Sequence, residues 1–139
     1  MGDCACNSGI KIIYSCSGAA DVGEIADRAV RALKREGFAQ GSCIAAVGAG
    51  LSGYVESAKG ADVNIVVDGC PVGCARKIME NIGITPVSYI VTEMGFAKGS
   101  SPANPEAIET VYRNIKEGKT GAQKSVGGSG CGCGCSGSC

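Results

Sequence analysis

The segment that most constrains the fold of this chain is residues 63–82, where two cysteines stand between a strand pattern and a helix pattern. Residues 63–67 are mostly apolar and β-branched, which is typical of a buried strand. The apolar residues after the cysteines recur at helical spacing: Ala75, Ile78, Met79 and Ile82. Because Pro71 suits the first helical position, we expect Cys70 at the helix N-cap and Cys74 one turn later. Thiols at a helix N-terminus favour the thiolate form, which binds soft metals and attacks sulfur.

The first part of the chain shows the same order of strand, cysteine and helix. Residues 10–15 predict a strand, and Cys16 follows it directly. Residues 21–37 predict an amphipathic helix, with apolar positions on one face and charged positions on the other. Asp21 and Glu24 resemble a capping box at the start of that helix.

The next unit allows two interpretations. In the first, residues 38–43 form the strand and a helix follows Cys43, although this segment has a poor strand propensity. In the second, residues 43–47 form the strand, and residues 48–53 make the Gly-x-Gly-x-x-Gly turn of a dinucleotide-binding site.

The spacing of three cysteines favours the first interpretation. Cys16, Cys43 and Cys70 stand 27 residues apart, and each is followed by a helix candidate. Residues 86–92 predict a fourth strand, and a last helix begins at residues 104–105. The sequence therefore predicts an α/β fold, a three-layer Rossmann-like or flavodoxin-like open sheet of about four mainly parallel strands with helices on both faces. If the strands, numbered along the chain, lie in the order 2-1-3-4, these cysteines meet at the carboxyl edge of the sheet.

The composition also predicts how the chain is divided. We expect residues 1–9 to be a flexible N-terminus and residues 10–117 to form a single α/β metal-binding domain. From residue 118 the sequence changes to Gly, Ser and Cys with almost nothing apolar. Residues 118–139 are therefore predicted to be a disordered tail.

The composition excludes several classes of function. Thirteen basic and thirteen acidic residues cancel, so neither nucleic acid nor a membrane surface is expected as a partner. The chain has no His, which excludes His-dependent catalysis and His-ligated zinc. No apolar run is long enough to span a bilayer, and the start lacks the pattern of a signal peptide. The cytoplasm is the expected compartment, where ten cysteines indicate metal or redox ligands rather than disulfides.

Four cysteines expected near one edge of the sheet indicate a metal site. Thiolates of Cys16, Cys43, Cys70 and Cys74 suit a tetrahedral zinc ion or an iron–sulfur cluster. Asp68 is a candidate for positioning a ligand, although an Asp at such a turn often caps the following helix. Cys16 and Cys43 can also be small buried core residues, and this alternative stays open.

The same residues resemble a known family. Cys16-Ser17-Gly18, Cys43 and the stretch Asp68-Gly69-Cys70-Pro71-x-x-Cys74 are similar to the DGC-domain family, for which zinc binding has been proposed. The likeness runs from about residue 10 to residue 98, and Asp-Gly-Cys-Pro-x-x-Cys is its most specific part. The resemblance implies a zinc ion held by the four cysteines at these positions. It does not define an activity or identify a protein partner, and it does not include the tail.

Other functions remain as alternatives. A thiol redox or sulfur-transfer protein would use Cys70 as its nucleophile and Cys74 to resolve the intermediate. Cys70, Gly73 and Arg76 also have the spacing of a Cys-based phosphatase, but Pro71 removes a phosphate-binding N–H from that loop. The cysteines of the tail are candidates for auxiliary metal capture: Cys131, Cys133, Cys135 and Cys139.

Overall fold

The computed structural model describes residues 9–119 of the chain. The predictions for the first eight residues and for the tail from residue 120, with Cys131, Cys133, Cys135 and Cys139, lie outside the described residues. No helix within residues 9–119 is long and apolar enough to cross a membrane.

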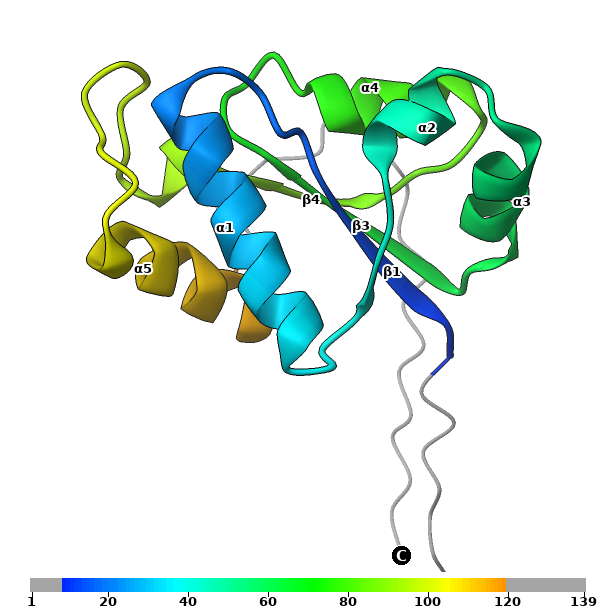
Figure 1. Cartoon of the computed structure of the whole chain (residues 1–139), viewed down its shortest axis with the longest axis horizontal. Helices are drawn as coiled ribbons and strands as arrows, with labels where there is room; N and C mark the ends of the chain where they lie inside the picture. The colour runs from blue at the N-terminus through cyan, green and yellow to red at the C-terminus, as the bar shows by residue number, and fades with distance from the viewer. Residues whose placement is uncertain (1–8, 120–139) are drawn as a thin grey trace, which may run out of the picture.

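Within the described residues, four parallel strands form one sheet (Figure 1). The strands are β1 (Lys11–Ser15), β2 (Gln40–Gly41), β3 (Val63–Asp68) and β4 (Val87–Ile90). Their order in the sheet is β2-β1-β3-β4. Each strand is joined to the next by a helical connection, as parallel neighbours require. The predicted α/β open sheet and its strand order are confirmed.

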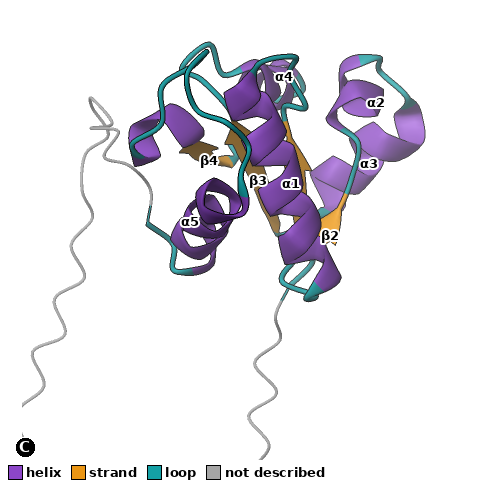
Figure 2. Cartoon of the chain, turned by 60° about the vertical axis from the view of Figure 1, so that its left-hand side comes forward, coloured by secondary structure: helices purple, strands orange, loops and turns teal. Residues whose placement is uncertain are grey.

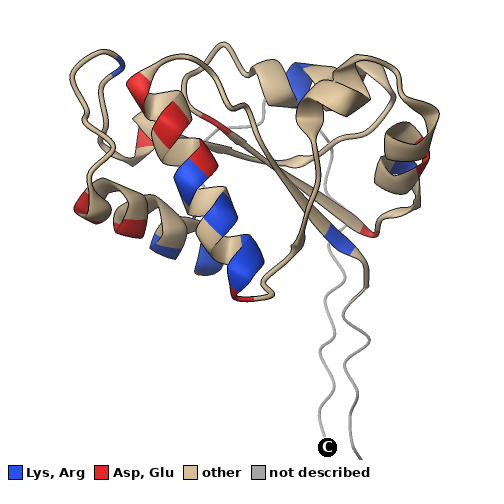
Figure 3. Ribbon diagram, viewed as in Figure 1, with Lys and Arg blue, Asp and Glu red and all other residues tan. Residues whose placement is uncertain are grey.

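One face of the sheet is covered by α1 (Asp21–Arg35) and α5 (Pro105–Lys116), which lie side by side (Figure 1). The apolar stripe of α1 is buried against the sheet and α5, as its helical spacing predicts. α5 begins where expected, because the Asn104 side chain accepts the N–H of Ala107 at 2.8 Å and Pro105 follows it. Both helices carry acidic residues in the first turn and basic residues in the last (Figure 3), which suits the helix dipole.

The opposite face carries α2 (Ile44–Gly48), α3 (Ser52–Gly60) and α4 (Cys74–Asn81), and Figure 2 shows the sheet between the two groups of helices. Alternate residues of β1 point to opposite faces, because side chains alternate along a strand. Ile13 belongs to the core under α1 and α5, whereas Tyr14 belongs to the core under α2 and α4. The sheet is therefore buried on both sides.

The second unit follows the first of the two interpretations. Residues 44–48 are helical, so the interpretation of residues 43–47 as a strand is wrong. β2 has only two residues, in keeping with the poor strand propensity, although the Ser42 N–H extends its ladder to the Ile13 carbonyl at 3.1 Å. The glycine-rich turn of residues 48–53 connects two helices rather than a strand and a helix. It therefore lacks the strand–turn–helix geometry that a dinucleotide-binding site requires.

Two further predictions are corrected at element ends. β4 ends at Ile90, and a 3-10 helix, η1 (Val91–Met94), replaces the end of the predicted strand over residues 86–92. The predicted capping box is absent, because the N-cap of α1 is Ala20 and no side chain caps it.

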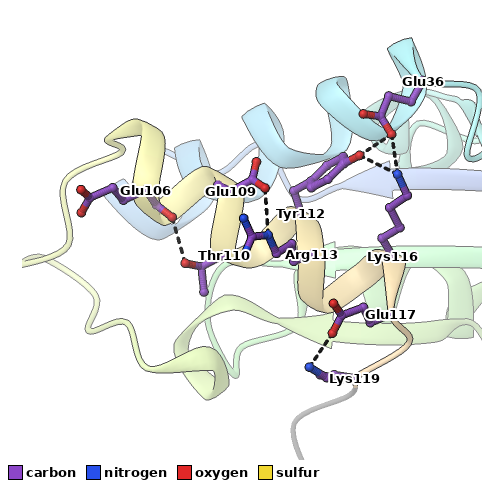
Figure 4. Close-up of polar contacts among 9 residues, drawn as sticks. All are labelled: Glu36, Glu106, Glu109, Thr110, Tyr112, Arg113, Lys116, Glu117 and Lys119. Carbon is purple, nitrogen blue, oxygen red and sulfur yellow. Dashed lines mark hydrogen bonds and ion pairs between the residues drawn. The ribbon is translucent and has the colours of Figure 1, made fainter.

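A surface cluster closes the seam between α1 and α5 (Figure 4). The carboxylate of Glu36, at the C-cap of α1, accepts hydrogen bonds from the Tyr112 hydroxyl and from the Lys116 ammonium. The bonds from Tyr112 and Lys116 hold the pKa of the Glu36 carboxyl below its usual value. The side chains of Glu36 and Lys116 are each 50% exposed, so we expect this cluster to contribute little to stability.

Candidate functional site

The carboxyl edge of the sheet carries the cysteines. Cys16 follows β1 directly, Cys43 lies between β2 and α2, and Cys70 lies just beyond β3. Their predicted placement at this edge is observed, because the strands are parallel and end on the same side. Cys16, Cys43, Cys70 and Cys74 are free thiols. Cys16 and Cys70 are half-buried, whereas Cys43 and Cys74 are exposed.

Glycines let the backbone segments at this edge lie in direct contact. A Cβ on Gly69 would stand 2.7 Å from the backbone nitrogen of Gly23, and a Cβ on Gly23 would stand 2.6 Å from the carbonyl oxygen of Gly18. The turn after β3 therefore packs on the first turn of α1, which packs on the loop after β1. Across this contact the Gly69 N–H donates to Cys16 Sγ at 3.3 Å. This bond ties Cys16 to the segment that carries Cys70.

The helix after Cys70 begins later than predicted. α4 starts at Cys74, after Gly73 in the left-handed conformation with φ of +65°. Cys70 and Pro71 therefore belong to a turn, and the prediction of Cys70 at the helix N-cap is wrong. Because only Cys74 lies in the helix, the two thiols do not share a helix face, and the turn alone sets their relative position.

Asp68 explains why α4 starts where it does. Its carboxylate accepts the backbone N–H of Ala75 at 2.9 Å and that of Arg76 at 3.2 Å. These are N–H groups of the first turn of α4, which lack partners inside the helix. Burial raises the pKa of the Asp68 carboxyl, and the two N–H donors oppose that shift. The helix-capping interpretation of Asp68 is confirmed, and its action on a metal ligand stays a prediction.

A pocket of about 470 Å³ opens where these segments meet, and we call it the thiol pocket. Cys16, Cys70 and Cys74 all line it. The rest of its wall consists mainly of glycines and small apolar residues from the loop after β1, from the start of α1 and from the turn before α4.

Cys43 lines a different pocket. This second pocket, of about 560 Å³, is bordered by Cys43, Cys16 and polar residues of α1, but not by Cys70 or Cys74. Cys16 therefore lies between the two pockets, and we call the second one the serine pocket.

The polar side chains of the serine pocket bind one another. The hydroxyls of Ser15 and Ser17 each donate to the Asp27 carboxylate at 3.0 Å, and Arg31 donates to it at 2.6 Å. Burial raises the pKa of Asp27, but these hydrogen bonds outweigh it and leave the pKa below its usual value. Ser17 has a φ of +48°, the only positive φ outside glycine in the described part of the chain. The network thus holds the turn around Cys16 in a conformation that few L-residues adopt.

Comparison with known proteins assigns the chain to a family. A model of the DGC domain matches residues 12–115, which include all four cysteines of the two pockets. The chain belongs to the DGC-domain family. A curated relative, the anaerobic and virulence modulator AnvM of Pseudomonas aeruginosa, is 29% identical over 90 residues, covering 64% of this chain and 69% of the relative. No solved structure matches the chain significantly.

The DGC domain of this chain gathers its thiols around two pockets rather than one point. Within residues 9–119, no group of three Cys, Asp or Glu side chains is close enough to hold a metal ion. Three of the predicted ligands face the thiol pocket, and Cys43 faces the serine pocket with Cys16. Ligation of one zinc ion by all four thiolates stays a prediction.

One residue of this DGC domain, Lys98, borders the thiols without a signal in the sequence. The ammonium of Lys98 lies 3.9 Å from Cys70 Sγ. Its loop is held by Asp21, whose carboxylate accepts the backbone N–H of Gly99 and that of Ser101, each at 2.8 Å. These N–H donors lower the pKa of the Asp21 carboxyl. The contact joins positions 78 residues apart, which local spacing in the sequence cannot reveal.

Proposed function

We propose that the chain binds a soft metal ion, zinc in the first place, through cysteine thiolates at the carboxyl edge of its sheet. The observation that carries this proposal is the thiol pocket, where the loop after β1 brings Cys16 next to Cys70 and Cys74 of the segment after β3. Thiolates are the ligands that zinc prefers in closed sites and that bind iron–sulfur clusters. Membership in the DGC-domain family supports the same conclusion.

The donor set fits such a metal, although the sulfurs must approach one another to bind it. The chain has no His, so cysteine thiols are the donors that suit such a metal at this edge of the sheet, and the four described cysteines are free. Cys70 lies in a turn outside helix and strand, and Cys74 is exposed at the first position of α4. We therefore expect metal binding to draw this turn towards Cys16, while Asp68 keeps the start of α4 in place.

Cys43 is the proposed fourth ligand. It shares the serine pocket with Cys16, and it stands at the N-cap of the five-residue helix α2. A tetrahedral site therefore requires Cys43 to turn past Cys16 towards the thiol pocket. Such a site needs reduced thiols, which the cytoplasm maintains.

Anaerobic purification with metal analysis and an absorption spectrum tests the proposal. We expect one colourless zinc ion per chain, bound tightly enough to compete with a chelating dye. A brown chromophore would instead assign an iron–sulfur cluster to the same thiols. A chain that purifies without metal and takes up none in titration would overturn the proposal.

Variants separate the ligands from the other cysteines. Cys70→Ser and Cys74→Ser should each lower zinc affinity by at least about 100-fold, because a hydroxyl replaces a ligating thiolate. Cys43→Ser tests the fourth position, where an unchanged affinity would leave a three-sulfur site. Deletion of residues 128–139 removes the tail cysteines Cys131, Cys133, Cys135 and Cys139 but none of the four proposed ligands. A lower metal content in this variant would assign additional metal capture to the tail, and an unchanged content would contradict it.

A specific contact favours a second candidate function, thiol redox or sulfur transfer. Lys98 places its ammonium group 3.9 Å from Cys70 Sγ. Reactive cysteines typically lie in partly exposed, electropositive surroundings of this kind. Cys74 would then resolve a disulfide formed at Cys70. Under this function the metal-free protein would be alkylated fastest at Cys70, and mild oxidation would join Cys70 to Cys74.

A further inference from the structure

The thiol pocket is larger than a metal ion needs. Its volume of about 470 Å³ lies in the range of small-molecule sites, roughly 300–1,000 Å³, whereas one water molecule takes up about 30 Å³. Beyond the three thiols, most of its wall is apolar: Gly18, Ala19, Ala20, Val22, Gly23 and Val72. The wall therefore suits the carbon skeleton of a small organic molecule.

One positive charge borders this apolar wall. Lys98 is the cation among the residues that line the thiol pocket, and Asp68 is the acid. The Asp68 carboxylate is only 1% exposed and is already bonded to two N–H groups of α4. Lys98, in contrast, is exposed, and its ammonium has three N–H donors, of which the contact with Cys70 occupies one. The charge that the pocket offers to a ligand is therefore positive.

The loop that carries Lys98 is held in place by a contact with α1. This loop is bonded through the N–H groups of Gly99 and Ser101 to Asp21, in the first turn of α1. The start of α1 also forms part of the apolar wall, through Val22 and the two residues before Asp21. Asp21 thus keeps the cation and the apolar wall in one relative position.

From these observations we propose that the thiol pocket binds a small organic anion. The apolar part of the ligand packs against Ala19, Ala20 and Val72, and its negative group pairs with Lys98. Its bound position brings it beside the sulfurs of Cys16, Cys70 and Cys74. This ligand site goes beyond the proposed metal binding and does not require a metal to be present.

A titration of the reduced, metal-free full chain followed by ¹H–¹⁵N NMR tests this site. The probe is phenylacetate, which combines an apolar ring with a carboxylate, and its matched neutral control is phenylacetamide. We expect phenylacetate to shift the amides of residues 19–23, 69, 70, 72–74 and 98 with millimolar affinity, and phenylacetamide to bind about two- to fivefold more weakly. Equal affinity for the two probes, shifts confined to other regions, or no shifts would overturn the proposal.

Variants assign the charge to Lys98. Lys98→Gln should weaken phenylacetate binding about fivefold and leave phenylacetamide unchanged, whereas Lys98→Arg should retain most of the affinity. Lys77→Gln removes an exposed lysine of α4 that does not line the pocket, and it should have no effect. Asp21→Asn should weaken phenylacetate binding less than Lys98→Gln does. If Lys98→Gln and Lys77→Gln behave alike, Lys98 does not bind the anion.

The test is independent of the proposed metal site. The titration uses the metal-free chain, so its failure leaves zinc binding untouched. If the chain binds no zinc, the phenylacetate result still decides whether the pocket takes organic anions.

Discussion

The thiol pocket and the α1–α5 seam are held together by different means. At the thiol pocket, the backbone of Gly69 packs directly on that of Gly23, and the buried Asp68 carboxylate binds the first turn of α4. At the seam, long side chains meet on the surface, with Glu36 bonded to Tyr112 and Lys116. The backbone contact at Gly69 leaves no room for an added methyl group, whereas long exposed side chains can move apart at little cost. Substitutions should therefore have large effects at the pocket and small effects at the seam.

The largest effect is expected for Gly69→Ala. Its Cβ would meet backbone atoms of Val22 and Gly23 at 2.8 and 2.7 Å, and backbone cannot rotate away as a side chain can. We expect a loss of about 3 kcal/mol in the free energy of unfolding, measured by urea denaturation. Gly53→Ala is the control, because Gly53 lies in α3 and no atom outside its chain neighbours and the nearby backbone of α3 would stand within 4 Å of the added Cβ. The stability of that variant should be unchanged or higher by up to about 1 kcal/mol. Similar losses of stability in Gly69→Ala and Gly53→Ala would mean that the backbone contact at Gly69 is not the cause.

Asp68→Ala should have the next largest effect. The substitution leaves the N–H groups of Ala75 and Arg76 without their acceptor, and Ala75 is fully buried. We expect a loss of about 2 kcal/mol, again in urea denaturation. Hydrogen exchange should be faster at the first turn of α4 than in α5, which packs on the opposite face of the sheet. Unchanged exchange at Ala75 would mean that Asp68 does not set the start of the helix.

The smallest effect is expected at the seam, and it should depend on pH. The pKa of Glu36 is lower in the folded chain than its usual value of 4.5, because Tyr112 and Lys116 bind its carboxylate. Its stabilising contribution is therefore present above pH 4.5 and is lost as the pH falls through the lower folded value. Glu36→Gln should shift the urea midpoint slightly at pH 7, and the two proteins should converge in acid. A difference that grows in acid would contradict the assignment.

Local patterns in the sequence predicted most of the elements but not all of their ends. Strand and helix periods located β1, α1, β3 and α5, since each has a clear apolar spacing and α5 has its Asn104 cap. β2 carries no such signal, and only the spacing of the cysteines favoured it. Cys70 was expected at a helix N-cap because Pro71 suits a first turn, but the left-handed Gly73 and the cap from Asp68 delay α4 to Cys74.

By itself, the sequence determined that strands and helices alternate and that cysteines follow the strands. The spacing of apolar residues along a short segment identifies each element, and alternating strands and helices then imply a parallel sheet. The tertiary structure decided how the thiols are distributed. It placed Cys16 between two pockets, turned Cys43 into the second one, and brought Lys98 beside Cys70 through Asp21. These arrangements rest on close glycine packing and on hydrogen bonds between positions far apart in the chain, which no local spacing encodes.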